Sequence, residues 1–200
     1  VSKCLLVFDV RGLIAEEYVD AGIWREGSLV FRAIKLVERI GLRKANQVVV
    51  LTERMREWLI QQHLVQPANV EVIPCCADLA RFTAEAKQDD TAPSQVADCF
   101  EVIYAGSVTG LYLLEEMGQF FLALHARFPM AYLRILTHPP AAPAAARLRR
   151  VGLQEKDFWI GAVAPEEVPG YLRRAKLGLS FRKPTFSQIA ASPTKIPEYL

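Results

Sequence analysis

The sequence predicts an α/β protein built from two doubly wound units, in which parallel strands alternate with helices. Short, apolar, β-branched segments alternate with longer segments whose apolar residues recur at helical spacing. A polar stretch from about Thr83 to Asp98 interrupts this alternation once, after which it restarts. Such strands are typical of parallel sheets that helices cover. We therefore expect two Rossmann-like domains that face each other across a cleft, with ligands at the carboxyl ends of the strands.

In the first half of the chain, the apolar patterns predict three strands and two helices. The strands are expected at residues 4–8, 47–51 and 70–73. An amphipathic helix over residues 28–42 places Val30 and Val37 on one face. Thr52 is expected to cap the second helix, because a threonine side chain accepts a hydrogen bond from the first helical turn.

The second half repeats the alternation. Strands are expected at residues 101–105, 131–136, 157–161 and 177–181, and helices at 111–128, 143–151, 165–175 and from Pro193 onward. This pattern predicts three parts of the chain. Residues 1–82 form a first domain, 83–99 a linker, and 100–200 a second domain.

Both ends of the sequence resemble cut ends. The chain begins with Val1 and enters a strand almost at once, and only about two helical turns follow Ser192. We expect a fragment truncated at both ends, which lacks the start of the first domain and the end of the second. Such a fragment is expected to be catalytically inactive by itself.

The composition excludes several classes of protein. With 52% hydrophobic and 23% charged residues the chain is globular, and a net charge of +2 does not indicate a nucleic-acid partner. No apolar run is long enough for a transmembrane helix, and no secretory signal is present. The four cysteines and three histidines show no metal-ligand spacing. We expect a cytoplasmic protein whose basic stretches at 147–150 and 173–176 are solvated helix faces or approach the inner face of a membrane.

The last nine residues predict a helix that holds a phosphate. Ser192 is a favourable N-cap and Pro193 a favourable first helical residue, with Thr194 following. Free N–H groups in the first turn and the helix dipole attract anions, and Lys195 adds a positive charge. Glu198 could accept hydrogen bonds from hydroxyl groups of the molecule that carries the phosphate. An ordinary capped helix is the alternative.

A second phosphate-binding feature follows the strand at 101–105. Gly106 and Gly110 enclose a short loop in which Ser107 and Thr109 carry hydroxyl groups, and the glycines let backbone N–H groups approach a phosphate. Arg182 and Lys183 follow the strand at 177–181. Since three strand ends converge, we expect these residues to form one anion site with the terminal helix.

The chain resembles the retaining glycosyltransferases of family 4, which have the GT-B fold. The resemblance covers nearly the whole chain, and its most specific part is the segment 192–200, followed by the turn Asp9-Val10-Arg11-Gly12. Segments 104–107, 180–187 and 192–200 resemble the half of these enzymes that binds the sugar donor. Segments 45–52 and 72–78 resemble the half on the acceptor side.

The resemblance implies transfer of a sugar, with retention, from a nucleotide-diphosphate donor to a hydroxyl of a glycan, lipid-linked or small-molecule acceptor. Donor-binding residues are then expected in three groups: Gly106, Ser107 and Thr109; Arg182 and Lys183; and Ser192, Pro193, Thr194, Lys195 and Glu198. No cofactor or metal is expected, and the chain has no Asp-x-Asp motif. Biosynthesis of a glycan or polysaccharide is the expected process.

The candidate catalytic residues are Arg11 and Asp9, at the end of the first strand. Arg11 could stabilise the leaving group or hold an acidic acceptor. Alternatively, the pair binds Glu16 or Glu17 and fixes the loop. The sequence departs from the family at Ala190, where members often carry a glutamate eight residues before the one that Glu198 matches.

Two other functions remain open. A nucleotide-sugar epimerase uses the same fold and needs carboxylates and a histidine on the cleft walls, for which His138 is the nearest candidate. A non-catalytic module that binds a nucleotide sugar is the other reading, because Ala190 replaces a contact with the donor sugar.

Overall fold

The computed structural model describes residues 4–82, 99–138 and 140–200 and separates the chain into two compact units. The first unit comprises the chain up to Cys76 together with Lys183–Pro193, and the second comprises Ala77–Arg182 together with Thr194–Leu200. Each unit holds one sheet, and every strand pair within the described sheets is parallel. The predicted α/β class is confirmed.

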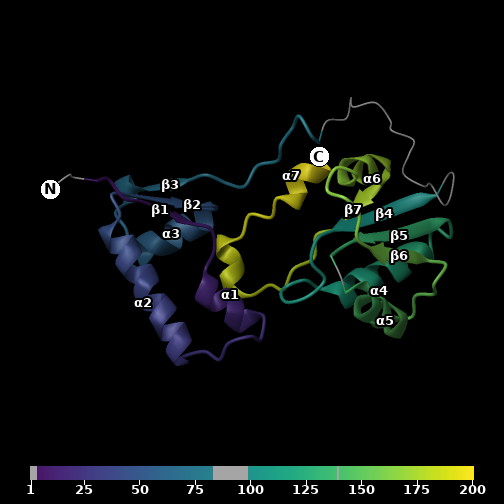
Figure 1. The fold of residues 1–200 in the computed structure, drawn as a ribbon, viewed down its shortest axis with the longest axis horizontal. Coiled ribbons are helices and arrows are strands. Elements are labelled where there is room, and N and C mark those ends of the chain that lie inside the picture. The colour runs from purple at the N-terminus through teal and green to yellow at the C-terminus, as the bar shows by residue number, and fades with distance from the viewer. Residues whose placement is uncertain (1–3, 83–98, 139) are drawn as a thin grey trace. The chain divides into compact units, whose positions relative to one another are not determined.

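The first unit has a three-stranded sheet in the order β1-β2-β3 (Figure 1). Its elements are β1 (Val7–Val10), α1 (Ile14–Asp20), α2 (Leu29–Lys44), β2 (Gln47–Val50), α3 (Glu53–Gln61), the 3₁₀ turn η1 (Pro67–Asn69), β3 (Val70–Val72) and the 3₁₀ turn η2 (Phe186–Ala190). Apolar side chains of the sheet, such as Val48 and Val50, pack with Met55 and Leu59 of α3. This core fixes which face of the sheet the helices cover.

Most predicted elements of this unit form, and their caps explain where they start. The Thr52 hydroxyl accepts a hydrogen bond from the Met55 N–H at 3.1 Å, as predicted, and Ser28 caps α2 in the same way. The first strand was predicted too early, because the register with β2 pairs Val7 to Val10. Val30 and Val37 share a face of α2 that is exposed in the described structure. The sequence analysis did not predict α1 or η2.

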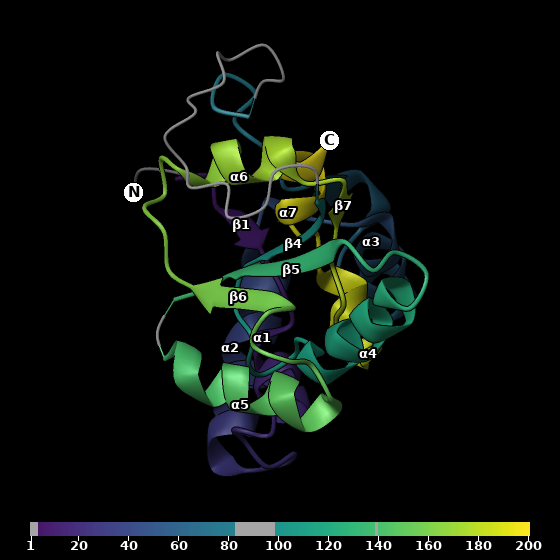
Figure 2. The same cartoon turned by 90° about the vertical axis from the view of Figure 1, so that its right-hand side faces the viewer.

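The second unit has a four-stranded sheet in the order β6-β5-β4-β7. Its elements are β4 (Phe100–Ala105), α4 (Leu114–His125), β5 (Ala131–Leu136), α5 (Ala141–Val151), β6 (Phe158–Gly161), α6 (Val168–Arg174), β7 (Leu177–Gly178) and α7 (Lys195–Tyr199). Figures 1 and 2 show α4 and α5 on one side of this sheet and α6 on the other. Both faces of the central strands are therefore buried, which explains why their sequences are apolar apart from Glu101 and Arg134.

Two predicted boundaries in this unit differ from the structure for one reason. The helix predicted over 111–128 begins only at Leu114, and the strand predicted over 177–181 pairs only at Leu177–Gly178. An isolated antiparallel bridge joins Tyr112 to Arg182, and the Leu113 N–H bonds to the Phe181 carbonyl. This pairing holds the chain before α4 in an extended form.

The segment Lys183–Pro193 belongs with the first unit by its contacts. The Thr52 hydroxyl donates to the Ile189 carbonyl, and the Ser187 N–H donates to the Asp20 carboxylate at 3.3 Å. The predicted domain over 100–200 included this segment, and the predicted linker lies outside the described residues except for Cys99. The proposed division into two domains and a linker stays a prediction.

A buried ion pair joins the two central strands of the second unit. Arg134 of β5 donates to the Glu101 carboxylate of β4, and the two side chains are only 6% and 9% exposed. The Arg134 guanidinium also lies 5.1 Å from the ring centre of Tyr171 in α6.

No helix in the described ranges combines the length and apolar character needed to cross a bilayer.

Candidate functional site

The candidate site lies where the strand order of the second sheet reverses. The chain runs from β4 outward to β5 and β6 and then returns to pair β7 on the other side of β4. The carboxyl ends of β4 and β7 are therefore neighbours at a topological switch point, where doubly wound folds bind ligands. Gly106–Gly110 follows β4, and α7 packs beside both strand ends.

Tyr199 fixes α7 at this switch point. Its hydroxyl accepts a hydrogen bond from the Ala105 N–H and donates one to the Leu179 carbonyl, both at 3.1 Å. The Tyr199 ring lies against Gly178, where an added Cβ would stand 2.4 Å from a ring carbon. Burial raises the pKa of Tyr199 to about 12, so the hydroxyl stays protonated and can donate. A short helix is thus tied to two strands.

Lys195 is a buried cation at the first position of α7. Lys195 is only 7% exposed, and its Nζ atom lies 4.6 Å from the ring centre of Tyr104 and 4.4 Å from that of Tyr112. Nζ also donates to the Tyr104 hydroxyl at 3.3 Å. Burial, aided by the charge of Arg182, lowers the pKa of Lys195 to about 8. Within the described residues Lys195 forms no ion pair with a carboxylate.

Gly106 is required for the approach between this lysine and the loop after β4. Its φ of +145° lies outside the range that other residues adopt comfortably, and a Cβ there would lie 2.9 Å from Lys195 Nζ. Tyr104 supports the same loop by donating its hydroxyl to the Ser107 carbonyl. The Thr109 N–H bonds the Ser107 hydroxyl at 3.3 Å, which closes the loop internally.

A cavity of about 610 Å³ lies beside these groups in the second unit. Six of the predicted donor-binding residues line it: Gly106, Ser107, Thr109, Thr194, Lys195 and Glu198. Thr137 and His138 after β5 and Val163 after β6 form other parts of the wall. Arg81, which donates to the Pro165 carbonyl, also lines it. The volume is in the range of a small-molecule site.

Arg182 lies close to the cavity without lining it. Its guanidinium is 5.3 Å from the ring centre of Tyr112, the ring that also faces Lys195. The Nε atom of Arg182 is buried, with no hydrogen-bond partner in the described structure. Arg182 therefore adds positive charge behind Lys195, as its effect on the lysine pKa indicates.

The prediction that Ser192 caps the last helix is wrong. The helix begins at Lys195 after Thr194, without a capping side chain, and the Ser192 hydroxyl instead accepts from the Cys75 N–H at 3.2 Å. Pro197 explains the later start. A helix that began at Pro193 would place Pro197 where its missing N–H should bond the Pro193 carbonyl. Since α7 has only five residues, Lys195 rather than the helix dipole supplies the positive charge.

Five predicted site residues belong to the first unit and not to the second, which holds the cavity: Asp9, Arg11, Lys183, Ser192 and Pro193. Lys183 lies near Asp20; burial acts to raise the pKa of that carboxyl, but hydrogen bonds from Ser187 and Thr185, with the charge of Lys183, lower it. Arg11 Nε donates to Asp9 at 2.9 Å, and this bond raises the Arg11 pKa. The two candidate catalytic residues thus pair with each other, while Glu16 pairs with Lys35 of α2.

Ala190 is fully buried in the core of the first unit, at the position where the family often carries a glutamate. A carboxylate there would lose its hydration without a described partner. The alanine is therefore consistent with its apolar surroundings.

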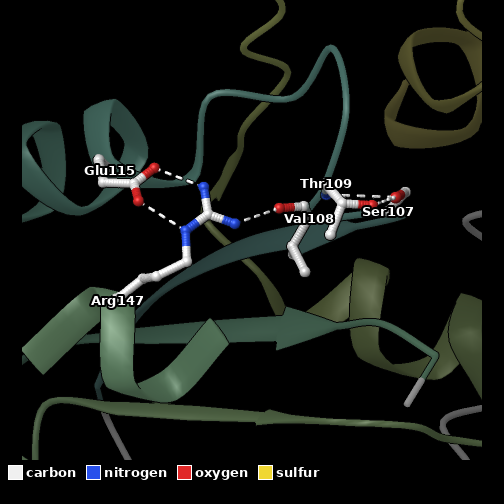
Figure 3. A network of polar contacts seen from close by, with 5 residues as sticks. All are labelled: Ser107, Val108, Thr109, Glu115 and Arg147. Carbon is white, nitrogen blue, oxygen red and sulfur yellow. Dashed lines mark hydrogen bonds and ion pairs between the residues drawn. The ribbon is translucent and has the colours of Figure 1, made fainter. Parts of the chain in front are cut away.

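Arg147 belongs to the basic stretch 147–150, which was predicted to be a solvated helix face or to approach a membrane, but its side chain is only 28% exposed and is held by other groups. Arg147 of α5 binds the Glu115 carboxylate through two hydrogen bonds of 2.5 Å and donates to the Val108 carbonyl at 2.8 Å (Figure 3). The Glu115 bond raises the Arg147 pKa, and the Arg147 bond lowers that of Glu115. Arg147 also lines the cavity.

The sequence pattern did not reveal the two tyrosines that face Lys195, Tyr104 and Tyr112. Neither lies near Lys195 in sequence, so no local spacing connects them to it. One signal was present, because a tyrosine at the end of a buried strand needs a partner for its hydroxyl. As for metals, the described residues contain no group of three His, Cys, Asp or Glu side chains that could hold an ion.

Comparison with solved structures shows the fold. The chain is similar to a trehalose-phosphate synthase (UDP-forming) from Burkholderia vietnamiensis, with a TM-score of 0.64 and 10% identity over 98% of this chain and 49% of that one. It is similar to HepE from Anabaena, solved with UDP and glucose, with a TM-score of 0.60 and 13% identity over 89% and 46% of the two chains.

A third similar structure is a sucrose-phosphate synthase from Thermosynechococcus elongatus, with a TM-score of 0.57 and 18% identity over 86% of this chain and 43% of that one. No protein-family model matches the chain, and no curated protein matches it in sequence. In each of the three comparisons, this chain covers less than half of the length of the similar structure. The likeness establishes the Rossmann-like α/β fold of GT-B glycosyltransferases.

Proposed function

We propose that the cavity beside α7 binds the diphosphate of a nucleotide sugar and that the whole protein is a glycosyltransferase. The observation that carries this proposal is that Lys195 is buried at the cavity wall and, among the described residues, forms no ion pair with a carboxylate. Burial and the charge of Arg182 lower the Lys195 pKa by more than the charge of Glu198 raises it. A buried charge is costly unless it is paired. An anionic ligand would supply the missing charge, and the cavity lies where doubly wound folds bind nucleotides.

The structural neighbours support the choice of ligand. One of them is a UDP-forming synthase, and another was solved with UDP and glucose. In this chain, Glu198 on the cavity wall would accept hydrogen bonds from ribose hydroxyls of the donor. Lys195 would bind the diphosphate, with Arg182 behind it and the Ser107–Thr109 segment beside it.

The finer features of the reaction are part of the same proposal. We assign the protein to the retaining family 4 enzymes, which transfer a hexose to a glycan, lipid-linked or small-molecule hydroxyl without a metal ion. Arg11, oriented by Asp9, would meet the leaving group or an acidic acceptor. The proposed location is the cytoplasm, with the inner face of a membrane as an alternative within it.

Calorimetric titration of the full-length protein with a panel of nucleotide sugars, beside an assay of donor turnover, tests the proposal. Binding with turnover that needs an acceptor supports a glycosyltransferase. Binding without turnover would leave a non-catalytic module, and no binding by any member of the panel would refute the site. Lys195→Ala should weaken binding of the preferred nucleotide sugar, and Lys156→Ala, at an exposed lysine of the same unit, is its control.

One observation keeps an epimerase as the second candidate. His138 lines the same cavity as Glu198, so a histidine and a carboxylate are both present in the cavity wall. An epimerase would convert the donor to its epimer in the absence of an acceptor. Product analysis by NMR after incubation with donor alone separates the two reactions.

A further inference from the structure

The loop after β4 has two consecutive carbonyl groups held by side chains from outside the loop. The Tyr104 hydroxyl donates to the Ser107 carbonyl, and Arg147 Nη1 donates to the Val108 carbonyl at 2.8 Å. Figure 3 shows the Arg147 guanidinium between the Val108 carbonyl and Glu115. Free carbonyl oxygens would repel a phosphate, so their engagement favours a loop conformation that accepts an anion.

The same loop carries hydrogen-bond donors that an anion could use. Among the described residues, no hydrogen bond is found for the backbone N–H groups of Ser107 and Val108. The hydroxyls of Ser107 and Thr109 lie 3.3 Å apart, and both residues line the cavity. The conformation of this segment therefore decides whether these donors are available to one phosphate.

Arg147 is itself held in place and largely neutralised. Its Nε and Nη2 atoms donate to the two oxygens of Glu115, at the first turn of α4, each at 2.5 Å. Such a bidentate pair fixes the plane of the guanidinium. The third bond, to Val108, then has a set direction. The pair thus connects the loop to both helices on that side of the sheet, α4 and α5.

We propose that Arg147 is a positioning residue that holds the Gly106–Gly110 loop in its anion-accepting form through the Val108 carbonyl. Arg147 acts on the donor without touching it, and Glu115 orients Arg147. This inference rests on the proposed function for its meaning in donor binding. The hold on the loop itself is a property of the ligand-free protein.

The sign of one substitution separates positioning from direct contact. Calorimetry with UDP, GDP and ADP identifies the diphosphate that binds most tightly, and Glu115→Gln is then compared with wild type. If Arg147 acts through the loop, Glu115→Gln weakens affinity about threefold to tenfold, because Arg147 loses its orientation. Tighter binding in Glu115→Gln would overturn the proposal, since it would mean that the carboxylate competes with phosphate for Arg147.

The conservative variant Arg147→Lys completes the test. A lysine keeps the charge, but its single nitrogen cannot bind both Glu115 oxygens side by side and also reach the Val108 carbonyl as the three guanidinium nitrogens do, so affinity should fall about tenfold. The double variant should bind no more weakly than Arg147→Lys alone, because both changes act on one unit. Arg149 and Glu155, an exposed pair that begins on the same helix, provide matched control variants. Unchanged affinity with a lower melting temperature would reduce Arg147 to a structural role and refute the inference.

Hydrogen exchange of the ligand-free protein keeps this inference distinct from the proposed function. If no diphosphate binds wild type, the proposed function fails. Amide exchange over residues 106–110 should still be faster in Arg147→Lys than in wild type and Arg149→Lys. Equal exchange in all three proteins would refute the positioning of the loop.

Discussion

Replacement of Lys195 by methionine should separate ligand affinity from stability. Methionine fills a similar volume without charge, and the residue it replaces is 93% buried against Tyr104 and Tyr112. Loss of one hydrogen bond to a charged phosphate is worth about 1.5 to 3 kcal/mol, or roughly 10-fold to 150-fold in affinity. The free energy of unfolding without ligand should stay the same or rise, because an unpaired buried charge is removed.

The pH dependence of ligand affinity and of the free energy of unfolding provides a second, independent test of Lys195. The pKa of Lys195 is about 8 in the folded chain, against an ordinary value of 10.5. Above pH 8 the folded protein loses this proton, so affinity for a nucleoside diphosphate should fall. Between pH 8 and 10.5 the unfolded chain holds the proton and the folded chain does not, so this group makes the free energy of unfolding rise with pH.

Titration calorimetry and thermal melting of Lys195→Met from pH 6.5 to 9.5 provide the assay. Lys195→Arg should flatten the pH profile, because arginine keeps its charge throughout this range. Lys156→Met, at an exposed position of the same unit, is the control. If Lys195→Met binds UDP, GDP and ADP as wild type does, the cavity is not a diphosphate site.

Three further predictions concern other parts of the chain. Glu198→Gln should raise the donor KM several-fold more than Glu116→Gln, whose side chain is exposed on α4, and equal effects would make Glu198 an ordinary surface residue. Glu101→Gln should lower the free energy of unfolding by about 3 kcal/mol in urea titrations, because it strands the buried Arg134, while a double replacement by methionine should cost less. If the proposed function holds, the full-length protein should keep its turnover in EDTA, and loss of activity that Mg²⁺ or Mn²⁺ restores would refute metal independence.

Three strands of the second sheet, β4, β5 and β6, could be predicted closely because each is mainly apolar, whereas β7 is shorter than predicted. The strand over 131–136 is confirmed to the residue, since both of its faces are buried and the polar positions around it are clear. Elements with fewer buried residues were harder. The helix α1 buries only Ala15 among its seven residues, so its apolar periodicity is weak.

The candidate site could be predicted at the level of residues near strand ends but not of their contacts. Lys195, Glu198 and the loop after β4 line one cavity, as the convergence of strand ends predicts. Ser192 does not cap the helix because Pro197, which lacks an N–H, moves the start of the helix to Lys195. Arg147 was missed because its partner is 32 positions away in sequence, beyond any local pattern.

The surroundings of Lys195 determine what kind of ligand the cavity selects. Two ring faces stabilise the ammonium by about 0.5 to 2 kcal/mol each, yet its pKa remains below the ordinary value, so desolvation outweighs them. A neutral sugar cannot offset that desolvation, whereas a diphosphate can. Binding energy in this cavity should therefore come mainly from the phosphates, and discrimination between donor sugars must arise from residues other than Ala190, which is enclosed in the core of the first unit.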